Sequence, residues 1–308
     1  MSLTASQIFA IAVVEGLVTE VSLSGLLQVL YLRHRATKAK AWKDPSYRIT
    51  STISIAFNIS AISYAIIFMP QFFFVGSNCR AGSMFVNFLS HCTYFTFDCF
   101  TCFKTYLYSD GDPRVKWCTI AILSARIGVA ALDIYSSYSV WDGNLCNYIQ
   151  WPASGIAYNT LDIFIDLYCT IVSIQCATKF LEWDFTRIGE IIINENIIRS
   201  AVMLGVNLLE IYVSYTVANQ YFLFIAYTIQ NLAYTRLLNL EGFWIEERHK
   251  SYSTPQNETS VFNQLKALAQ ASSAQDGEST RNYGVGRKGR VVRASVTRVR
   301  SKVSVSFH

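Results

Sequence analysis

Residues 84–108 combine the length of a membrane-spanning helix with a row of side chains that could carry chemistry. The stretch contains no Pro or Gly, and a helix of this length crosses the roughly 30 Å hydrocarbon core of a bilayer. Polar residues recur every three or four positions: Asn87, His91, Tyr94, Asp98, Thr101 and Thr105. Because a carboxylate is costly in hydrocarbon, we expect this face to point toward protein or water. The pattern predicts the buried, central helix of a membrane protein.

Ionisable residues also occur within the other apolar stretches, where acids outnumber bases. The acids are Glu15, Glu20, Asp98, Asp133, Asp162, Asp166 and Glu210, and the basic partners expected at that depth are Arg126 and His91. Leaving out Glu15, which we place near the outer interface, and adding Asn231, these residues are the candidates for a ligand or ion site. The excess of acid favours a cation, a proton or a basic ligand. Interhelical hydrogen bonding with a purely structural role is an equal alternative.

Spacing indicates which of these residues can meet. Arg126 and Asp133 are seven residues apart on one helix, about 10 Å along its axis, so we expect Arg126 to pair across helices. Asp162 and Asp166 are four apart, which places two like charges side by side. Further polar stripes are Tyr158, Asp162, Asp166 and Ser173; Asn207, Glu210 and Ser214; Glu20, Ser24 and Gln28; Ser54 and Asn58; and Tyr227, Asn231 and Tyr234. Stripes on every helix predict a polar interior.

The composition of the whole chain supports the membrane interpretation. Of 308 residues, 15% are charged, well below the roughly 25% of soluble domains, and the mean hydropathy is +0.27. Seven apolar stretches predict helices over residues 8–32, 49–75, 84–108, 117–139, 155–181, 197–218 and 221–240. The expected fold class is all-α: a seven-helix transmembrane bundle over residues 1–250, integral and multi-pass in the lipid bilayer of the plasma membrane or an endomembrane.

The distribution of basic residues predicts the orientation in the membrane. With the adjoining helix ends included, the first, third and fifth loops hold six, three and three Lys or Arg, and the chain from Glu241 onward holds eleven. The amino terminus and the other three loops hold only Arg80. Because basic loops stay in the cytosol, we expect the amino terminus outside and the carboxyl terminus in the cytosol.

Residues 251–308 have the composition of a disordered tail. Ser, Thr, Gln, Asn and Gly dominate as far as Gly286, and residues 281–308 carry eight Lys or Arg and no acid. Such a tail is either simply solvated or bound to anionic lipid of the inner leaflet or to a cytosolic protein. Ser295, Thr297 and Ser301 lie among these charges, so phosphorylation there is expected to weaken such a contact.

Two cysteines extend the pattern toward a known family. Cys79 precedes the central helix on the outer side, and Cys146 lies in the next outer loop. With seven helices, an outer amino terminus and a basic cytosolic tail, residues 1–245 resemble a G-protein-coupled receptor, and the resemblance implies a Cys79–Cys146 disulfide. The family's acid-arginine-tyrosine triplet is replaced by Lys104, Thr105 and Tyr106, and its Asn-Pro-x-x-Tyr motif by Asn231, Leu232, Ala233 and Tyr234.

We therefore expect receptor-like ligand sensing and signal transduction, with an unknown small ligand or cation as partner. The alternatives are a cation- or proton-coupled transporter or channel, and a structural membrane scaffold. We expect no enzyme activity, no metal site and no nucleic-acid partner, because His91 is the one histidine at membrane depth and no catalytic motif occurs. We also expect no retinal, since residues 221–240 contain no Lys to form a Schiff base.

Overall fold

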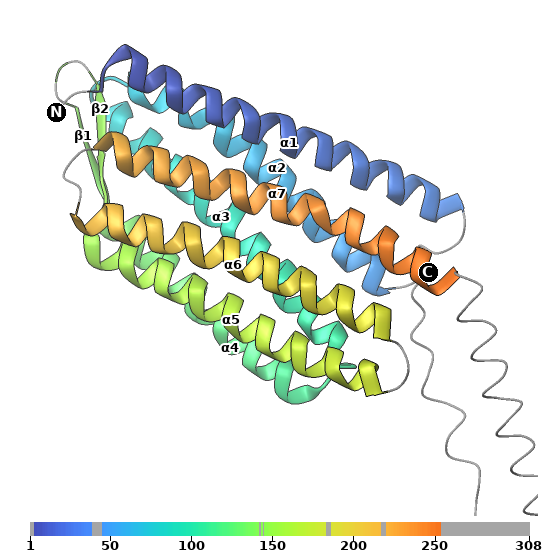
Figure 1. Cartoon of the computed structure of the whole chain (residues 1–308). Coiled ribbons are helices and arrows are strands. Elements are labelled where there is room, and N and C mark those ends of the chain that lie inside the picture. The colour runs from blue at the N-terminus through green and yellow to red at the C-terminus, as the bar shows by residue number, and fades with distance from the viewer. Residues whose placement is uncertain are drawn as a thin grey trace, which may run out of the picture. The chain divides into compact units, whose positions relative to one another are not determined.

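The computed structural model describes residues 3–38, 45–141, 143, 145–182, 186–216 and 220–253. These residues form seven α-helices, one short 3₁₀ helix and one β-hairpin (Figure 1). The elements are α1 Ala5–Lys38, α2 Pro45–Phe68, η2 Pro70–Phe73, α3 Ser77–Tyr108, α4 Pro113–Ser136, β1 Tyr138–Trp141, β2 Cys146–Ile149, α5 Pro152–Glu182, α6 Thr186–Thr216 and α7 Gln220–Ser253. Met1–Ile245 make up one unit of contacts and Glu246–His308 a second. The helices and the hairpin belong to the first unit, apart from the last residues of α7.

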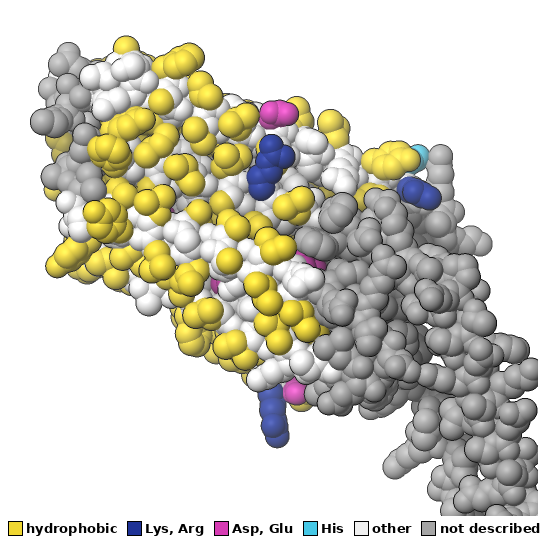
Figure 2. Space-filling view, viewed as in Figure 1, with side chains coloured by type: hydrophobic (Ala, Val, Ile, Leu, Met, Phe, Trp, Pro, Cys, Tyr) yellow, Lys and Arg dark blue, Asp and Glu magenta, His cyan; other side chains and the backbone are white. Residues whose placement is uncertain are grey.

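Five of the helices are long and apolar enough to cross a membrane. They cover Ala5–Arg35, Pro45–Phe73, Pro113–Ser136, Pro152–Thr178 and Ile192–Thr216. Hydrophobic side chains dominate the face of the molecule seen in Figure 2, as expected for a surface in contact with lipid. By the length and composition of these helices, the chain is a multi-pass membrane protein.

The seven predicted helices are all present, but several end elsewhere. α3 begins at Ser77, seven residues before the predicted start, so Cys79 lies on the helix and not in a loop. α2 ends at Phe68, and the chain continues from Pro70 as a 3₁₀ turn, because proline lacks the N–H that the helix needs. α6 begins at Thr186, eleven residues before the predicted start at residue 197. α7 continues to Ser253, past the predicted end at residue 240.

The all-α prediction is wrong in one place, the connection between α4 and α5. The predicted helix over residues 117–139 ends at Ser136, where Ser137 is extended. The following residues form an antiparallel hairpin in which Tyr138 pairs with Ile149 and Trp141 with Cys146. Gly143, in the turn, has a φ of 98°, a conformation that glycine adopts without strain. The hairpin lies at the same end of the molecule as the start of α1 (Figure 1).

α3 holds the centre of the helix packing, as the sequence predicts. It contacts α2, α4, α5 and both hairpin strands. Two of its buried aromatic residues, Tyr94 and Phe97, join the main buried cluster with Phe57 of α2, Tyr158 of α5 and Tyr234 of α7. Five aromatic rings from four helices therefore meet midway along α3, which fixes the helices that carry the candidate site.

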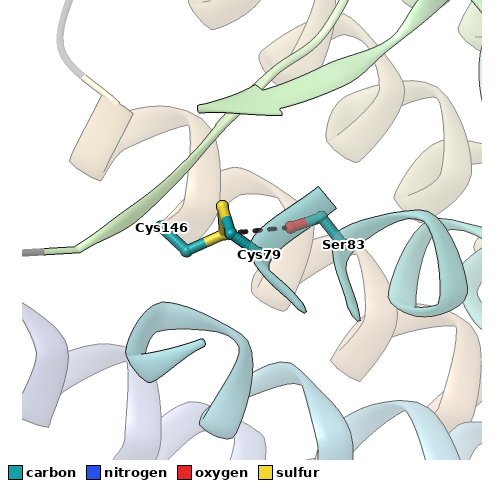
Figure 3. Close-up of a disulfide and its surroundings, with 3 residues drawn as sticks. All are labelled: Cys79, Ser83 and Cys146. Carbon is teal, nitrogen blue, oxygen red and sulfur yellow. Dashed lines mark hydrogen bonds between the residues drawn. A yellow bond between two sulfur atoms is a disulfide. The ribbon is translucent and has the colours of Figure 1, made fainter. Parts of the chain in front are cut away.

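A disulfide joins the hairpin to α3. Cys79, on the first turn of α3, is bonded to Cys146 of β2, and both residues are buried (Figure 3). Ser83, one turn further along α3, lies 3.4 Å from the Cys146 sulfur. The pairing that the receptor resemblance implies is confirmed. It holds β2 over the end of α3.

Candidate functional site

The polar stripe on α3 faces the interior, as predicted. Asn87 is half-buried, and His91, Tyr94, Asp98, Thr101 and Thr105 are buried. The stripe therefore passes through the middle of the molecule from the hairpin end toward the opposite end. Its members contact different groups at successive positions along α3. The polar atoms at some of these positions are all hydrogen-bonded, and at others they are not.

A cavity lies at the hairpin end of the stripe. It has a volume of about 50 Å³, which is room for water or a small polar ligand. Its wall is contributed by α2, η2, α3, α4, α5, α6, α7 and the hairpin. The polar residues of the wall are Gln71, Ser83, Asn87, Ser90, His91, Asp133, Gln150, Glu210 and Gln230, and its tyrosines are Tyr64, Tyr94, Tyr148, Tyr158 and Tyr227.

Asp133 of α4 is the most heavily bonded acid in this wall. One carboxylate oxygen, Oδ2, lies 3.0 Å from Nε2 of His91 and accepts a hydrogen bond of 3.0 Å from Asn87. The other, Oδ1, accepts from the hydroxyl groups of Ser154, at 2.5 Å, and Ser137, at 3.3 Å. Asp133 therefore pairs with His91 on α3 and not with Arg126 on its own helix, as the helical spacing predicts.

Three other side chains that line the cavity each have a buried polar atom with no hydrogen-bond partner among the described residues. These atoms are Oε2 of Glu210, Nδ1 of His91 and the hydroxyl of Tyr158. Each belongs to a side chain that is more than nine-tenths buried. Since buried polar groups are normally paired, these residues mark the part of the wall best suited to hold a ligand.

A network of amide side chains holds one carboxylate oxygen of Glu210. Oε1 of Glu210 accepts a hydrogen bond of 2.8 Å from Asn159 on α5. Gln230 of α7 donates to Asn159, at 3.3 Å, and to Asn207 of α6, at 2.8 Å. The sequence reasoning included Glu210 and Asn207 but missed Asn159 and Gln230. The sequence did offer a signal for both: Asn159 lies one helical turn from Asp162, and Gln230 is next to Asn231, each in an otherwise apolar helix.

Arg126 lies below the cavity and joins three helices. Its guanidinium is 3.0 Å from the carboxylate of Asp98 on α3 and 2.5 Å from that of Asp162 on α5. It also stacks on Tyr158, with Cζ 3.4 Å from the ring centroid. The Tyr234 hydroxyl donates to Asp162 at 2.8 Å, which brings in α7. The prediction that Arg126 pairs across helices is confirmed.

The group around Arg126 contains two carboxylates and one guanidinium, all almost completely buried. With every group ionised, it has one negative charge in excess. Tyr158 contacts both this group and the cavity wall: Cζ of Arg126 lies 3.4 Å from its ring centroid, and the His91 ring lies 4.7 Å away, measured between centroids. Tyr158 therefore links the cavity to the Arg126 group.

Two further acid–base pairs lie beyond Arg126. Arg199 of α6 donates to Asp166 of α5, at 3.1 Å, and to Thr170, at 3.2 Å. Lys104 of α3 pairs with Glu195 of α6. The prediction that Arg126 and His91 are the only basic partners of the buried acids is wrong: Lys104 and Arg199, counted with the basic loops because they lie near the ends of their apolar stretches, are buried and pair with acids of other helices.

The adjacent acids Asp162 and Asp166 do not share a site. Asp162 bonds to Arg126 and Tyr234, whereas Asp166 bonds to Arg199 and, at 2.5 Å, to the Ser200 hydroxyl. Asp162 therefore belongs to the Arg126 group, whereas Asp166, one helical turn further along α5, belongs to the pair with Arg199. Each carboxylate has its own cationic partner, which relieves the repulsion expected from their spacing.

Three predictions on α1 and α7 have mixed outcomes. The prediction that Glu20, Ser24 and Gln28 face the interior is wrong, since all three are exposed on α1. Glu15, which we expected near the outer interface, is buried, and its carboxylate oxygens have no partner among the described residues. Asn231 is buried but makes no side-chain hydrogen bond with the described residues, and the cavity wall does not include it.

The hairpin supplies the roof of the site. Tyr148 of β2 and Gln150, just after it, both line the cavity, and Gln150 is hydrogen-bonded to Tyr227 of α7. Burial raises the pKa of Tyr148 above its usual range, so its hydroxyl stays neutral. The disulfide at Cys146 holds these two side chains above the cavity.

No family model matches the chain, and no curated protein is similar enough to be counted as a relative. Among the residues that the structure describes, no group of three or more His, Cys, Asp or Glu is arranged to hold a metal ion. Ser295, Thr297, Ser301 and the basic tail lie outside the described residues, so the predictions for them stand as they are.

Proposed function

We propose that this chain is a receptor-like protein with seven membrane spans, in which α3 and α7 cross the bilayer together with the five apolar helices. α3 and α7 are more polar than the others, but their polar side chains are largely buried. Tyr234 of α7 and Asp98 of α3, for example, belong to the Arg126 group. A helix whose polar face is covered by neighbouring helices crosses a bilayer without exposing that face to lipid.

Two independent features support an outer amino terminus and a cytosolic carboxyl terminus. The end of the molecule that holds the hairpin carries Arg80 but no other Lys or Arg in its connecting segments, whereas the opposite loops are basic. The disulfide lies at the same, hairpin end, and disulfides persist on the oxidising side of a membrane. Charge and covalent chemistry thus favour the same orientation, in the plasma membrane or an endomembrane.

The observation that carries the receptor proposal is the cavity beneath the hairpin. In the proposed orientation it lies on the outer side, under a roof tied to α3 by the disulfide. The residues that line the cavity and keep an unpaired polar atom are Glu210, through Oε2, His91, through Nδ1, and Tyr158, through its hydroxyl. In the neutral imidazole whose Nε2 donates to Asp133, Nδ1 of His91 is an acceptor. Two acceptors, one of them a carboxylate, and a hydroxyl suit a small amine.

The contacts of Tyr158 suggest how binding is passed on. The Tyr158 ring contacts both the His91 ring and the Arg126 guanidinium. Arg126 in turn holds Asp98 of α3 and Asp162 of α5, and Asp162 holds Tyr234 of α7. A ligand that displaces the Tyr158 ring therefore changes contacts among α3, α4, α5 and α7 at once. No step in this proposal involves catalysis.

Thermal unfolding of the full-length chain in lipid nanodiscs tests the proposal. Small primary amines should raise the unfolding temperature, whereas the matched neutral alcohols should not. Glu210→Gln should weaken the amine effect at least about tenfold, the usual size for loss of a hydrogen bond to a charged group. Asp112→Asn, which removes an acid but keeps the helix cap of α4, is the control and should bind amines normally. Equal responses to amines and alcohols would rule out the amine site.

A second candidate function, cation- or proton-coupled transport, rests on the excess carboxylate at Arg126. A group of two acids and one base can take up a proton or a cation between the two sides of the membrane. In proteoliposomes with a pH gradient, this reading expects proton or cation flux that Asp98→Asn abolishes. A flux equal to that of empty liposomes leaves the receptor reading alone.

A further inference from the structure

The face formed by α1 and α7 carries charged and polar side chains at the middle of the membrane. Glu20 is exposed on α1 and lies fifteen residues from either end of the span Ala5–Arg35. Arg236 is exposed on α7. Figure 2 shows that hydrophobic side chains otherwise dominate this side of the molecule, on which α1 and α7 lie in front. Charged groups at this depth require a protein partner or water, because lipid tails provide neither hydrogen bonds nor counter-ions.

Glu20 and Arg236 lie at nearly the same depth. α1 and α7 both run away from the hairpin end, and the Asn239 amide of α7 donates to the Val21 carbonyl of α1 at 3.0 Å. Glu20 is one residue from Val21, and Arg236 is three residues from Asn239. At about 1.5 Å per residue, both side chains start within about one helical turn of this contact. They form no ion pair with each other within the described chain.

The α1 surface beside Glu20 also permits close approach of another helix. Gly16, Glu20, Ser24 and Gln28 follow at intervals of four, and the three polar members are exposed. A Cβ added at Gly16 would meet no atom within 4 Å, so the surface there is open. Small and polar residues repeated at this spacing are typical of helix pairs in membranes, since they allow backbones to approach and side chains to bond across.

We propose that this face joins two copies of the chain around a two-fold axis along the membrane normal, with Glu20 of each copy contacting Arg236 of the other. In a two-fold dimer, when one residue of the first copy contacts a second residue of the other copy, the same contact occurs in reverse. A face with one acid and one base at equal depth is therefore complementary to itself. A single pairing mode thereby covers all four charges. The proposal requires α7 to cross the membrane, but it does not depend on ligand binding.

Co-purification of two differently tagged full-length copies from membranes tests this pairing. Wild-type copies should co-purify. Glu20→Arg in both copies, or Arg236→Glu in both copies, should reduce the co-purified fraction at least about fivefold, because two interhelical polar contacts are lost in each dimer. Arg80→Glu, at the hairpin end, is the matched control for charge reversal and should not change the fraction.

The decisive arm mixes the two variants. One copy with Glu20→Arg and one with Arg236→Glu restore opposite charges at both contacts, so the mixed pair should co-purify at the wild-type level. Failure of the mixture, or normal co-purification of each variant with itself, would overturn the proposal. The first result would mean pairing within one chain or with a different protein, and the second a face without a role in association.

The Cys79–Cys146 disulfide, read by non-reducing mass spectrometry, checks that each variant is folded. Where charge reversal prevents folding, Glu20→Gln and Arg236→Gln replace it. Each should lower the co-purified fraction, and an unchanged fraction in both overturns the proposal.

Discussion

The hairpin half of the molecule and the opposite half use the same residue types for different purposes. Near the hairpin, Asp133 is fully bonded, but Glu210, His91 and Tyr158, which line a cavity, each keep an unpaired polar atom. Toward the opposite end, Asp166 is paired with Arg199 and Glu195 with Lys104. The cavity there is lined mainly by Phe97, Phe100, Ile198, Leu237, Leu238 and Leu240. Incomplete pairing around a polar cavity, and not the mere presence of intramembrane charge, distinguishes a candidate site from structural hydrogen bonding.

Arg126 lies at the boundary between the two halves and should be the least replaceable side chain. Arg126→Leu leaves Asp98 and Asp162 buried without a cation, and breaking a buried pair in this way costs about 3–5 kcal/mol. We expect a large fall in the unfolding temperature in detergent, or loss of the folded protein. Arg126→Lys should lose less stability than Arg126→Leu, and the control Arg80→Ala should lose none. A stable Arg126→Leu variant would show that the two halves are not joined at this residue.

Removal of the disulfide should have the next largest effect, and it acts on the hairpin half. Its bond closes a loop with a sequence separation of 67, and the chain-entropy model assigns about 4 kcal/mol to a loop of this size. Cys79→Ser with Cys146→Ser should lower stability and also weaken amine binding, because Tyr148 and Gln150 lose their support. If amine binding is unchanged in this variant, the hairpin does not contribute to the site.

The half opposite the hairpin provides a matched test of structural pairing. Lys104→Met alone removes the cation beside the buried Glu195 carboxylate and should cost about 3 kcal/mol, whereas Lys104→Met with Glu195→Leu should cost less than about 1 kcal/mol. Neither variant should alter amine binding. Chemical denaturation and ligand titration on the same samples measure both. A loss of binding here would end the distinction between the halves.

The smallest stability effect is expected at Glu210. Glu210→Gln keeps an oxygen that accepts from Asn159 and removes only the charge, so the free energy of unfolding should change by less than about 1 kcal/mol. Amine binding should nevertheless fall, as proposed above. A comparable loss of stability and binding would make Glu210 a structural residue like Glu195.

Much of the helix organisation could be predicted from the sequence. Runs of apolar residues locate the seven helices, and the three- and four-residue spacing of His91, Tyr94 and Asp98 identifies the buried face of α3. Helix ends were less predictable. The apolar criterion stops where lipid contact stops, but backbone hydrogen bonding continues α3 back to Ser77 and α7 on to Ser253.

The same criterion explains the errors among charged residues. Lys104 and Arg199 lie near the ends of the apolar stretches and were counted with the basic loops, yet each is buried against an acid of another helix. Glu20 and Glu15 are both on α1 and have the same chemistry, but one is exposed and the other buried. Helical periodicity ranks residues around one helix and does not say which face the neighbours cover.

By itself, the sequence determined how many helices there are, their membrane character and the two cysteines at the less basic end. These follow from local properties: length, hydropathy and charge along the chain. Only the tertiary structure decided that Arg126 bonds to Asp98 and Asp162, that Asp133 bonds to His91, and that Glu210 keeps an unpaired oxygen beside a cavity. Those pairings depend on how seven helices rotate and shift against one another, which is set by packing between segments far apart in the chain.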